Sequence, residues 1–300
     1  MANDIKLIQK FIPKLDTVYQ QNARTAILDA APEMVRETED ANVVKVAKMA
    51  FGGLGNYSKT DGYPTGAITL DWETWTFEND RGKRFNLDKM DNVETAGVAF
   101  FGVSGEFLRT KVIPEKDAYT IAFIAGYDGV EKVSEAIDAT NAKESLSKAT
   151  VYTANNEVDE ANLVLFCSPN FKESLENQLN RTLPTGVTSY GQKINYYNDI
   201  PLIVVPPRRF YSAIALQDGT SAGEEKGGYK KAEGANDLNY ILMDRTAVMT
   251  IQKNAVMQVI PPELNQLYNG WTFNYRFYYD AFMYENRVPG VYVSQTTAKP

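Results

Sequence analysis

Two long patterns that meet near residue 90 constrain the fold more than any other feature of the chain. Residues 52–90 alternate apolar and polar residues around glycine-rich turns, which predicts an extended β-hairpin. Residues 91–125 carry a helical pattern. A hairpin of this length cannot easily fold back onto its own domain. We therefore expect it to lie on another surface, and we expect that surface to belong to a second copy of the same chain.

The second half of the predicted hairpin holds the candidates for that contact. Apolar alternation changes parity between Trp72 and Trp75, which predicts a bulge or a sharp twist near residues 73–74. Residues 79–82, Asn-Asp-Arg-Gly, have turn chemistry and predict the tip. A charged tip is either a solvated loop or a contact with acidic groups of a neighbouring copy, and the sequence leaves both open. The intersubunit contact candidates are Trp72, Trp75, Arg81, Lys83 and Arg84.

The predicted helix has a capped start and a proline within it. Asp91 can cap the helix, and Glu94 completes a pair that is similar to a capping box. An unbroken helix over residues 91–125 would extend about 50 Å and would act as a scaffold spine. Pro114 predicts a kink or a break. One apolar face is expected to pack on an aromatic strand at residues 272–284, and the core residues of that face are Val93, Phe100 and Phe107.

The charge of the chain argues against a surface that coats nucleic acid. The chain has 300 residues, with 31 Lys and Arg against 38 Asp and Glu, so its net charge is −7 and its isoelectric point is about 4.9. Surfaces that bind nucleic acid are usually basic. The first residues do not have the pattern of a signal peptide, and no apolar stretch is long enough to cross a bilayer. We expect a protein that has no membrane partner and stays in a cytoplasm.

No catalytic residue, metal or cofactor is expected. The chain has no histidine, which removes the Ser-His-Asp and Cys-His nucleophile systems and the usual zinc and iron sites. The single cysteine, Cys167, lies in an apolar run and is expected to be a small buried hydrophobe. Residues 53–60 approach a phosphate-binding loop but have Ser58 where the last glycine is required. Residues 145–148 fit only the first part of a Ser-x-x-Lys enzyme signature.

The remaining segments predict an arm, a mixed subdomain and returning strands. Residues 1–50 begin with an amphipathic helical pattern and end in a strand at residues 42–51, and we interpret them as an arm that packs on something else. Residues 127–245 alternate helices and strands, which indicates an α/β or α+β subdomain. Its predicted helices are residues 130–149 and 169–181, and its predicted strands are residues 162–167, 201–205 and 239–243. Residues 219–237 predict a polar mobile loop, and strands follow at residues 247–251, 272–284 and 291–293.

In this order the segments resemble the major capsid protein of tailed bacteriophages, the Hong Kong 97-type shell fold. Residues 55–92 are similar to the extended loop of that family, which leads into its spine helix. Residues 194–210 are similar to its passage of small turn, strand and prolines, and residues 269–293 to its terminal strands. The resemblance covers the chain from about residue 42 onward, and its specificity lies in the order of the pieces.

The resemblance implies an α+β, Hong Kong 97-like capsid fold with five parts. Residues 1–51 would be an N-terminal arm, residues 52–90 the extended loop hairpin, and residues 91–126 the spine helix of the peripheral domain. Residues 127–245 would be the axial domain, and residues 246–300 the return strands of the peripheral domain with the C-terminus.

The resemblance also implies a structural role without catalysis. Copies of the chain would form hexamers and pentamers of an icosahedral shell that encloses a double-stranded DNA genome, with only non-specific proximity to that DNA. A scaffolding protein, a portal and decoration proteins would be partners. The protein would belong to the virion, and it would occupy the host cytoplasm during assembly.

Two other functions stay open at the level of sequence. The first is the shell of an encapsulin-like nanocompartment, which shares the fold. The second is a carbohydrate-binding or hydrolytic module, because Trp72 and Trp75 alternate with Asp71 and Glu73 on one predicted strand.

Overall fold

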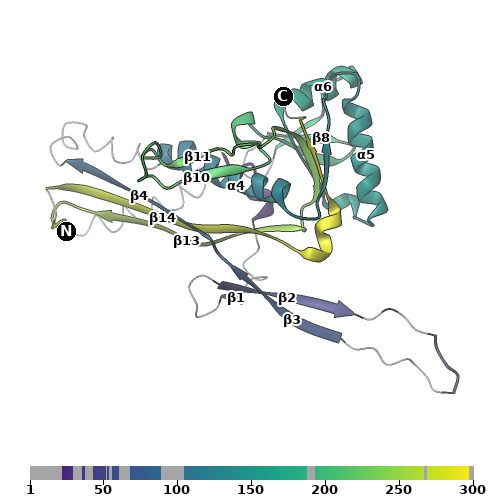
Figure 1. Ribbon diagram of the computed structural model, residues 1–300, viewed down its shortest axis with the longest axis horizontal. Coiled ribbons are helices and arrows are strands. Elements are labelled where there is room, and N and C mark those ends of the chain that lie inside the picture. The colour runs from purple at the N-terminus through teal and green to yellow at the C-terminus, as the bar shows by residue number, and fades with distance from the viewer. Residues whose placement is uncertain are drawn as a thin grey trace.

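The fold has three parts that meet at the end of one long helix (Figure 1). The computed structural model describes residues 22–29, 36–37, 43–51, 53, 56–60, 68–88, 105–187, 193–266 and 269–296. Within these residues, the first part is a seven-stranded sheet with helices, and the second is a three-stranded sheet beneath the long helix. The third is a hairpin that projects from the other two.

The seven-stranded sheet is the core of the subdomain predicted at residues 127–245. Its strand order is β5-β15-β12-β6-β9-β8-β7. In that order the strands are Glu131–Ser134, Val291–Gln295, Leu238–Asp244, Leu163–Cys167, Ile200–Val204, Lys193–Tyr197 and Thr185–Val187. The pairings of β15 with β5 and of β6 with β9 are parallel, and the other pairings are antiparallel.

Strand β6 shows why helices cover both faces of this sheet. All five of its residues are apolar and buried. Leu165 and Cys167 pack with helices α5 (Ala142–Asn155) and α6 (Pro169–Leu179), whereas Val164 and Phe166 pack with the long helix. Because successive side chains of a strand point to opposite faces, a continuous apolar run is typical of a strand between two helical layers. Cys167 is fully buried, as predicted, and its burial raises the pKa of the thiol.

The three-stranded sheet has the order β13-β14-β4, with all pairs antiparallel. Its strands are β13 (Val248–Ile260), β14 (Gly270–Met283) and β4 (Asn79–Asp88). The aromatic residues of β14 form its apolar surface with the start of the long helix: Phe273, Tyr275, Phe277 and Tyr279 pack with Leu108 and Val112. A strand whose aromatics cover a helix is the arrangement that the sequence predicts for residues 272–284.

The described part of the long helix runs from residue 105 to residue 126. It contains a π-helical segment, η3 (Leu108–Val112), followed directly by helix α4 (Ile113–Gly126). Pro114 does not break the helix, because the wider π-helical turn stands where the proline ring would crowd the backbone of the preceding turn. The predicted start of the helix, at residues 91–104, lies outside the described residues.

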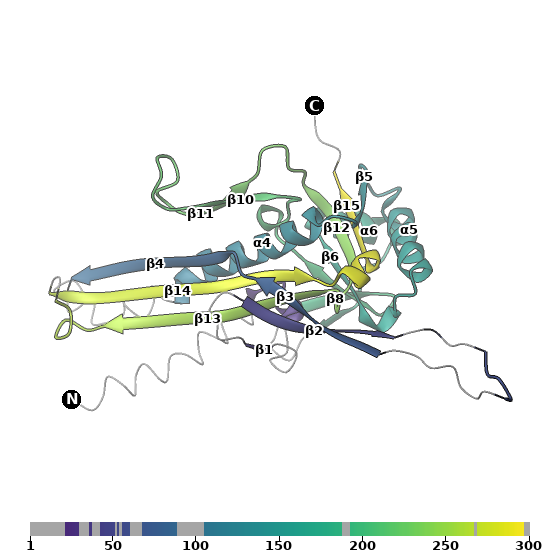
Figure 2. The same ribbon diagram turned by 60° about the horizontal axis from the view of Figure 1, so that its bottom comes forward.

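The projecting hairpin consists of β2 (Val43–Phe51) and β3 (Ile68–Thr76), with a short β1 (Arg36–Glu37) beside β2. The pairing runs without interruption from Val43↔Thr76 to Phe51↔Ile68, so the predicted bulge at residues 73–74 is wrong. The predicted partner of β3 is also wrong, because β3 pairs with β2 and not with the strand that follows it. Both views show the hairpin extending away from the two sheets (Figures 1 and 2).

Three other predictions need correction. Residues 130–149 are not one helix, because residues 131–134 form β5 beside β15 before α5 begins. Residues 219–237 are not all loop, because β11 (Gly228–Lys231) pairs with β10 (Ile214–Gln217). The C-terminal strand β15 does not stay with the return strands, because it pairs between β5 and β12 in the other sheet. In each case the hydrogen-bonded pairing of a strand with a segment distant in the sequence decides its structure, and the local residue pattern does not.

Short helical turns connect these elements. The 3-10 turns are η1 (Ala26–Leu28), η4 (Glu160–Asn162), η5 (Pro207–Arg209) and η6 (Glu285–Gly290). Helix α6 begins with Pro169 directly after Ser168, whose hydroxyl accepts a hydrogen bond from the Phe171 amide, and this is a standard N-terminal cap. No helix in the described ranges is both long enough and apolar enough to span a membrane.

Candidate functional site

The base of the hairpin packs in an apolar cluster with β13 and β14 of its own chain, and Trp75 is a member of that cluster. Its side chain is 7% exposed and stacks on the ring of Phe282 in β14, with centroids 4.8 Å apart and planes 10° apart. It also packs against Tyr284. The structure thus gives Trp75 a place in the core of its own chain, which leaves it little surface for contact with another copy. Trp75 lies on the face of β3 that meets β13 and β14 at the base of the hairpin.

Trp72 lies on the other face of β3 and is 44% exposed. Because it faces away from Trp75, the two rings cannot line one carbohydrate-binding cleft, and that alternative loses its basis. A large aromatic side chain at this level of exposure is a candidate for contact with another molecule. Trp72 therefore stays a candidate for intersubunit contact.

Asp280 fixes the crossing of the chain from the hairpin into β4. Its carboxylate accepts hydrogen bonds from the Glu78 amide at 2.8 Å and from the Tyr119 hydroxyl at 2.7 Å. The side chain is 4% exposed, and this burial raises the pKa of the carboxyl group above its ordinary value. A buried polar anchor at residues 77–78, beside the stacked Trp75, holds the hairpin in one direction relative to the sheets.

Arg81, Lys83 and Arg84 do not lie at a tip. All three are on β4, which pairs with β14 from Asn79 onward. The predicted turn at residues 79–82 is wrong, because a ten-residue ladder to β14 outweighs local turn chemistry. Gly82 suits the close approach of the two strands, since a Cβ atom at this position would lie 3.1 Å from the carbonyl oxygen of Tyr275.

The three basic residues of β4 differ in their surroundings. The Arg81 guanidinium forms an ion pair with Glu115 of α4 at 2.7 Å and donates a hydrogen bond to the Gly228 carbonyl oxygen of β11. Arg81 therefore ties β4, α4 and β11 together within one chain, and the prediction that it contacts a neighbour loses its support. Arg84 is exposed and donates to the Asn274 side chain, and Lys83 is exposed. Both side chains are exposed, Arg84 on the outer face of the sheet and Lys83 on the same face as Arg81 and Phe85.

Of the three predicted core residues of the long helix, Val93 and Phe100 lie outside the described residues. Phe107 is half-buried and packs edge-on against Phe85 of β4 and Tyr275 of β14, with centroid separations of 4.9 and 5.7 Å. It belongs to the same apolar cluster as Leu108 and Val112, on the helix face that covers the three-stranded sheet.

A buried carboxylate on α4 holds an N-terminal segment of the chain. Asp117 is 0% exposed and accepts hydrogen bonds from the amides of Arg24 and Thr25 and from the Thr25 hydroxyl, at 2.8–3.1 Å. The guanidinium of Arg209 completes its shell with an ion pair at 3.0 Å. We call this arrangement the N-terminal clasp.

Lys116, the residue before Asp117 in α4, holds the same N-terminal segment through a second contact. Lys116 is 1% exposed, and its ammonium group forms an ion pair with Asp29 at 2.6 Å. Asp29 also accepts a hydrogen bond from the Thr250 hydroxyl of β13. Burial lowers the pKa of Lys116, and the Asp29 carboxylate opposes that shift. Residues 22–29 are thus fixed on their own subunit by two consecutive charged residues.

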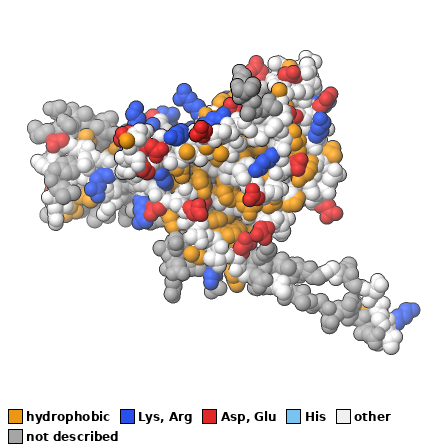
Figure 3. Space-filling model, viewed as in Figure 1, with side chains coloured by type: hydrophobic (Ala, Val, Ile, Leu, Met, Phe, Trp, Pro, Cys, Tyr) orange, Lys and Arg blue, Asp and Glu red, His pale blue; other side chains and the backbone are white. Residues whose placement is uncertain are grey.

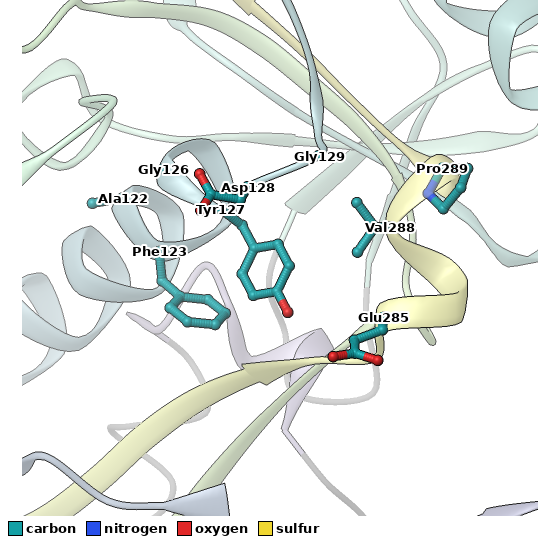
Figure 4. Close-up of a pocket in the computed structure, with 9 residues that line it drawn as sticks. All are labelled: Ala122, Phe123, Gly126, Tyr127, Asp128, Gly129, Glu285, Val288 and Pro289. Atoms are coloured by element: carbon teal, nitrogen blue, oxygen red, sulfur yellow. The ribbon is translucent and has the colours of Figure 1, made fainter.

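A hollow of about 880 Å³ opens where α4 ends and η6 begins (Figure 4). The rings of Phe123 and Tyr127 lie on one side of it, and Val288 and Pro289 lie on the other. Glu285 completes the lining on the η6 side. On this face of the molecule, apolar side chains gather in the centre with acidic side chains among and around them (Figure 3).

The hollow combines aromatic rings with negative charge. The Phe123 and Tyr127 centroids are 5.5 Å apart in an edge-on arrangement. Partial burial raises the pKa of the Tyr127 phenol, and the carboxylates of Glu285, Glu73 and Asp128 add to the shift. Such a surface favours an apolar partner that also carries positive charge.

Sequence reasoning missed the clasp and the hollow. Lys116 and Asp117 follow Glu115 in a run of three charged residues, and no local pattern in the sequence distinguishes these two from solvated charges. The hollow joins residues 122–129 to residues 285–289, which only the fold brings together. No group of three or more acidic, histidine or cysteine side chains suited to a metal occurs in the part of the chain that the structure describes.

The chain matches no protein-family profile and no curated protein sequence. Solved structures do resemble it along nearly its whole length. One is from Gordonia phage Cozz, with a TM-score of 0.57 and 13% identity over 93% of this chain and 87% of that one. The capsid structure of the cyanophage P-SCSP1u gives a TM-score of 0.57 and 12% identity over 88% and 86% of the two chains. A virus-like particle from Pyrococcus furiosus gives 0.52 and 12% over 93% and 95%.

Likeness at this level of identity establishes the fold. The chain therefore has the fold of tailed-phage capsid proteins, which is the fold that its sequence resemblance predicts.

Proposed function

We propose that this chain is a major capsid protein, whose copies assemble into a closed icosahedral shell around the double-stranded DNA genome of a tailed bacteriophage. The observation that carries the proposal is the likeness to phage structures over 84–94% of the chain in the matches with TM-scores from 0.50 to 0.57. A shell protein needs to present the same surfaces in every copy, and the seated hairpin base supports that requirement.

The hairpin β2–β3 is the surface that we assign to contact between copies. It is anchored by Trp75 at its base, yet it extends beyond the two sheets. Tyr57, in the segment that connects its two strands, is 61% exposed. An isolated pair of strands is only marginally stable in water. Contact with a neighbouring copy would bury Tyr57 and the exposed ring of Trp72 and would stabilise the strands.

The net charge of −7 supports a shell that encloses DNA without binding it tightly. Phosphate groups and an acidic wall repel one another, so packaged DNA would stay mobile and contact the shell only by proximity. The other proposed partners are a scaffolding protein, a portal and decoration proteins. The proposed location is the virion, with assembly in the host cytoplasm. The proposed role is structural and non-catalytic.

A nanocompartment shell that encloses protein cargo is the second candidate. Its support is the likeness to the virus-like particle from Pyrococcus furiosus, which covers 95% of that chain. The two candidate shells would use the same contacts between subunits, and they would differ in whether they enclose DNA or a cargo protein. Nuclease-protected DNA inside particles from the natural source would favour the capsid, and a co-purified cargo protein would favour the compartment.

The test of the proposal is the state of the purified chain in solution. Size-exclusion chromatography with negative-stain electron microscopy is expected to show hexamers, pentamers or closed shells, with shells increasing when a cognate scaffolding protein is added. A clean monomer at every salt and protein concentration, with no shells in the presence of that scaffolding protein, would overturn it.

A further inference from the structure

The hollow at the end of α4 carries negative charge and apolar surface together. Its described lining includes Asp128 and Glu285 and no lysine or arginine. Helix α4 ends at Gly126, and the carbonyl end of a helix carries partial negative charge. The Tyr127 ring points into the space between the two sides of the hollow (Figure 4). A surface of this kind is complementary to an aromatic side chain with a basic side chain beside it.

The hairpin of the same chain cannot supply that partner. Trp75 packs against Tyr284 on the inner face of β3, and Glu73 has the same parity as Trp75. The Glu73 carboxylate helps to raise the pKa of Tyr127, so the inner face adds negative charge near the hollow. Trp72 lies on the opposite face of β3 and points away from this side. Only a second copy can therefore bring a Trp72 side chain to the hollow.

The outer face of the hairpin, defined as the face of β2 and β3 that carries Trp72, has the required chemistry. Lys45 of β2 is paired with Thr74 of β3, which places Lys45 and Trp72 diagonally on this face, about 7–8 Å apart. Both side chains are exposed. Within the paired residues 43–51 and 68–76, no acidic residue shares this face, because Asp71 and Glu73 have the opposite parity. Strand geometry thus directs an aromatic ring and an ammonium group the same way.

The outer face and the hollow are different surfaces of one chain, so contact between them is head to tail. Each copy has one hairpin and one hollow, and a copy that uses its hairpin on one neighbour can receive another neighbour in its hollow. Repetition of a head-to-tail contact closes a ring when its rotation divides a full turn. This geometry agrees with the pentamers and hexamers proposed above.

We propose that the outer face of one copy's β2–β3 hairpin docks in the hollow of a second copy. The Trp72 ring would lie against Phe123 and Tyr127, and the Lys45 ammonium group would lie toward the two carboxylates of the lining. This inference rests on the proposed assembly of copies into a shell, and it adds which surface of the neighbour the hairpin contacts.

Photo-crosslinking in assembled particles tests the proposal. Isotopically heavy copies, with Trp72 replaced by benzoyl-phenylalanine, are co-assembled with an excess of light wild-type copies. The expected crosslinks join residue 72 of a heavy chain to residues 122–129 or 285–289 of a light chain. A second probe at Thr74, which keeps the Trp72 ring, is expected to crosslink to the same residues.

The outcomes separate this inference from the shell function. Crosslinks that map to other surfaces, or that stay within one heavy chain, overturn the inference and leave the shell function standing. Wild-type copies that remain monomers even with scaffolding protein overturn both.

Charge reversal tests the electrostatic part. Lys45→Glu in the heavy copy is expected to lower the crosslink yield about fivefold, because an exposed ion pair becomes a repulsion, and Glu285→Lys in the light copy is expected to restore the yield to within about twofold. Both side chains are exposed, so the fold should survive. The matched control is Lys148→Glu, an exposed residue of α5 outside the lining, which should leave the yield unchanged. An unchanged yield for Lys45→Glu, or a loss that Glu285→Lys does not restore, overturns the proposal.

Discussion

Trp75 stacks face to face on Phe282, with ring centroids 4.8 Å apart, and this contact joins the base of the projecting hairpin to the three-stranded sheet. The stack lies in an apolar cluster that draws on β2, β13 and β14, with Val44, Val46, Phe77, Met249 and Ile251 around it. Because this cluster holds the base of the hairpin, the hairpin has a fixed direction relative to the three-stranded sheet.

Replacing Trp75 with alanine is expected to destabilise the isolated subunit. The change removes a buried ring and leaves a cavity beside Phe282, at a cost of about 3–5 kcal/mol. The midpoint of urea denaturation should fall accordingly. The matched control is Trp72→Ala on the opposite, exposed face of the same strand, which should change subunit stability little. Equal midpoints for the two variants would contradict the assignment of Trp75 to the core.

Arg81→Ala is expected to destabilise the subunit while Arg84→Ala does not. Loss of the Arg81 guanidinium leaves Glu115, which is 14% exposed, without its partner, at a cost of about 1–3 kcal/mol. Arg84 is exposed, and its loss should stay within about 0.5 kcal/mol. Thermal denaturation of the two variants measures the difference. If Arg84→Ala proves the more damaging variant, β4 is not placed as described.

Asp117→Asn is expected to release the N-terminal segment. The substitution removes the negative charge that faces Arg209 and turns one acceptor into a donor opposite the amides of residues 24–25, at a cost of about 3 kcal/mol or more. Hydrogen exchange at the Arg24 and Thr25 amides should become fast. Asp128→Asn, on the exposed turn after α4, is the control. Slow exchange at both amides in Asp117→Asn would show that the clasp does not depend on this carboxylate.

Alkaline pH is expected to unfold the subunit in a narrow range. Burial raises the pKa of Tyr229 to about 12, and it also raises the pKa of Tyr240 and Tyr279. The unfolded chain loses phenol protons near pH 10, while the folded chain keeps these three. Because the unfolded state binds fewer protons, the free energy of unfolding falls as pH rises from about 10 to 12. Phenolate absorbance and circular dichroism should change together, and full phenol ionisation in a still-folded chain would contradict this.

Elements with a strong local pattern were predictable from sequence. Strand β6 is a continuous apolar run, and α6 begins with a Ser-Pro cap, so both appear at the predicted places. Strand β14 carries aromatics on its helix-facing side, and it appears where the sequence predicts it. In these cases one segment contains all the information needed to identify the element.

Which strands pair with one another was not predictable, because strand pairing depends on segments that are distant in the sequence. Residues 79–82 have turn chemistry, but pairing with β14 places them inside a strand. Strand β15 looks like a return strand, yet its partners are β5 and β12. The sequence around Trp72 and Trp75 does not indicate which of the two side chains is buried. Trp75 is buried because Phe282 of β14 packs against it.

The assignment of the hairpin to assembly is tested most directly by shortening it. In this variant a two-residue Asn-Gly turn replaces residues 52–67 and joins Phe51 to Ile68, which are paired in the structure. The apolar cluster at the hairpin base is unchanged, so the denaturation midpoint of the subunit should be unchanged. Sedimentation velocity, with wild-type protein and the same assembly partners in parallel, is expected to show shells for the wild type and only subunits or small oligomers for the variant. Shells of unchanged size and yield from the shortened chain would contradict the account.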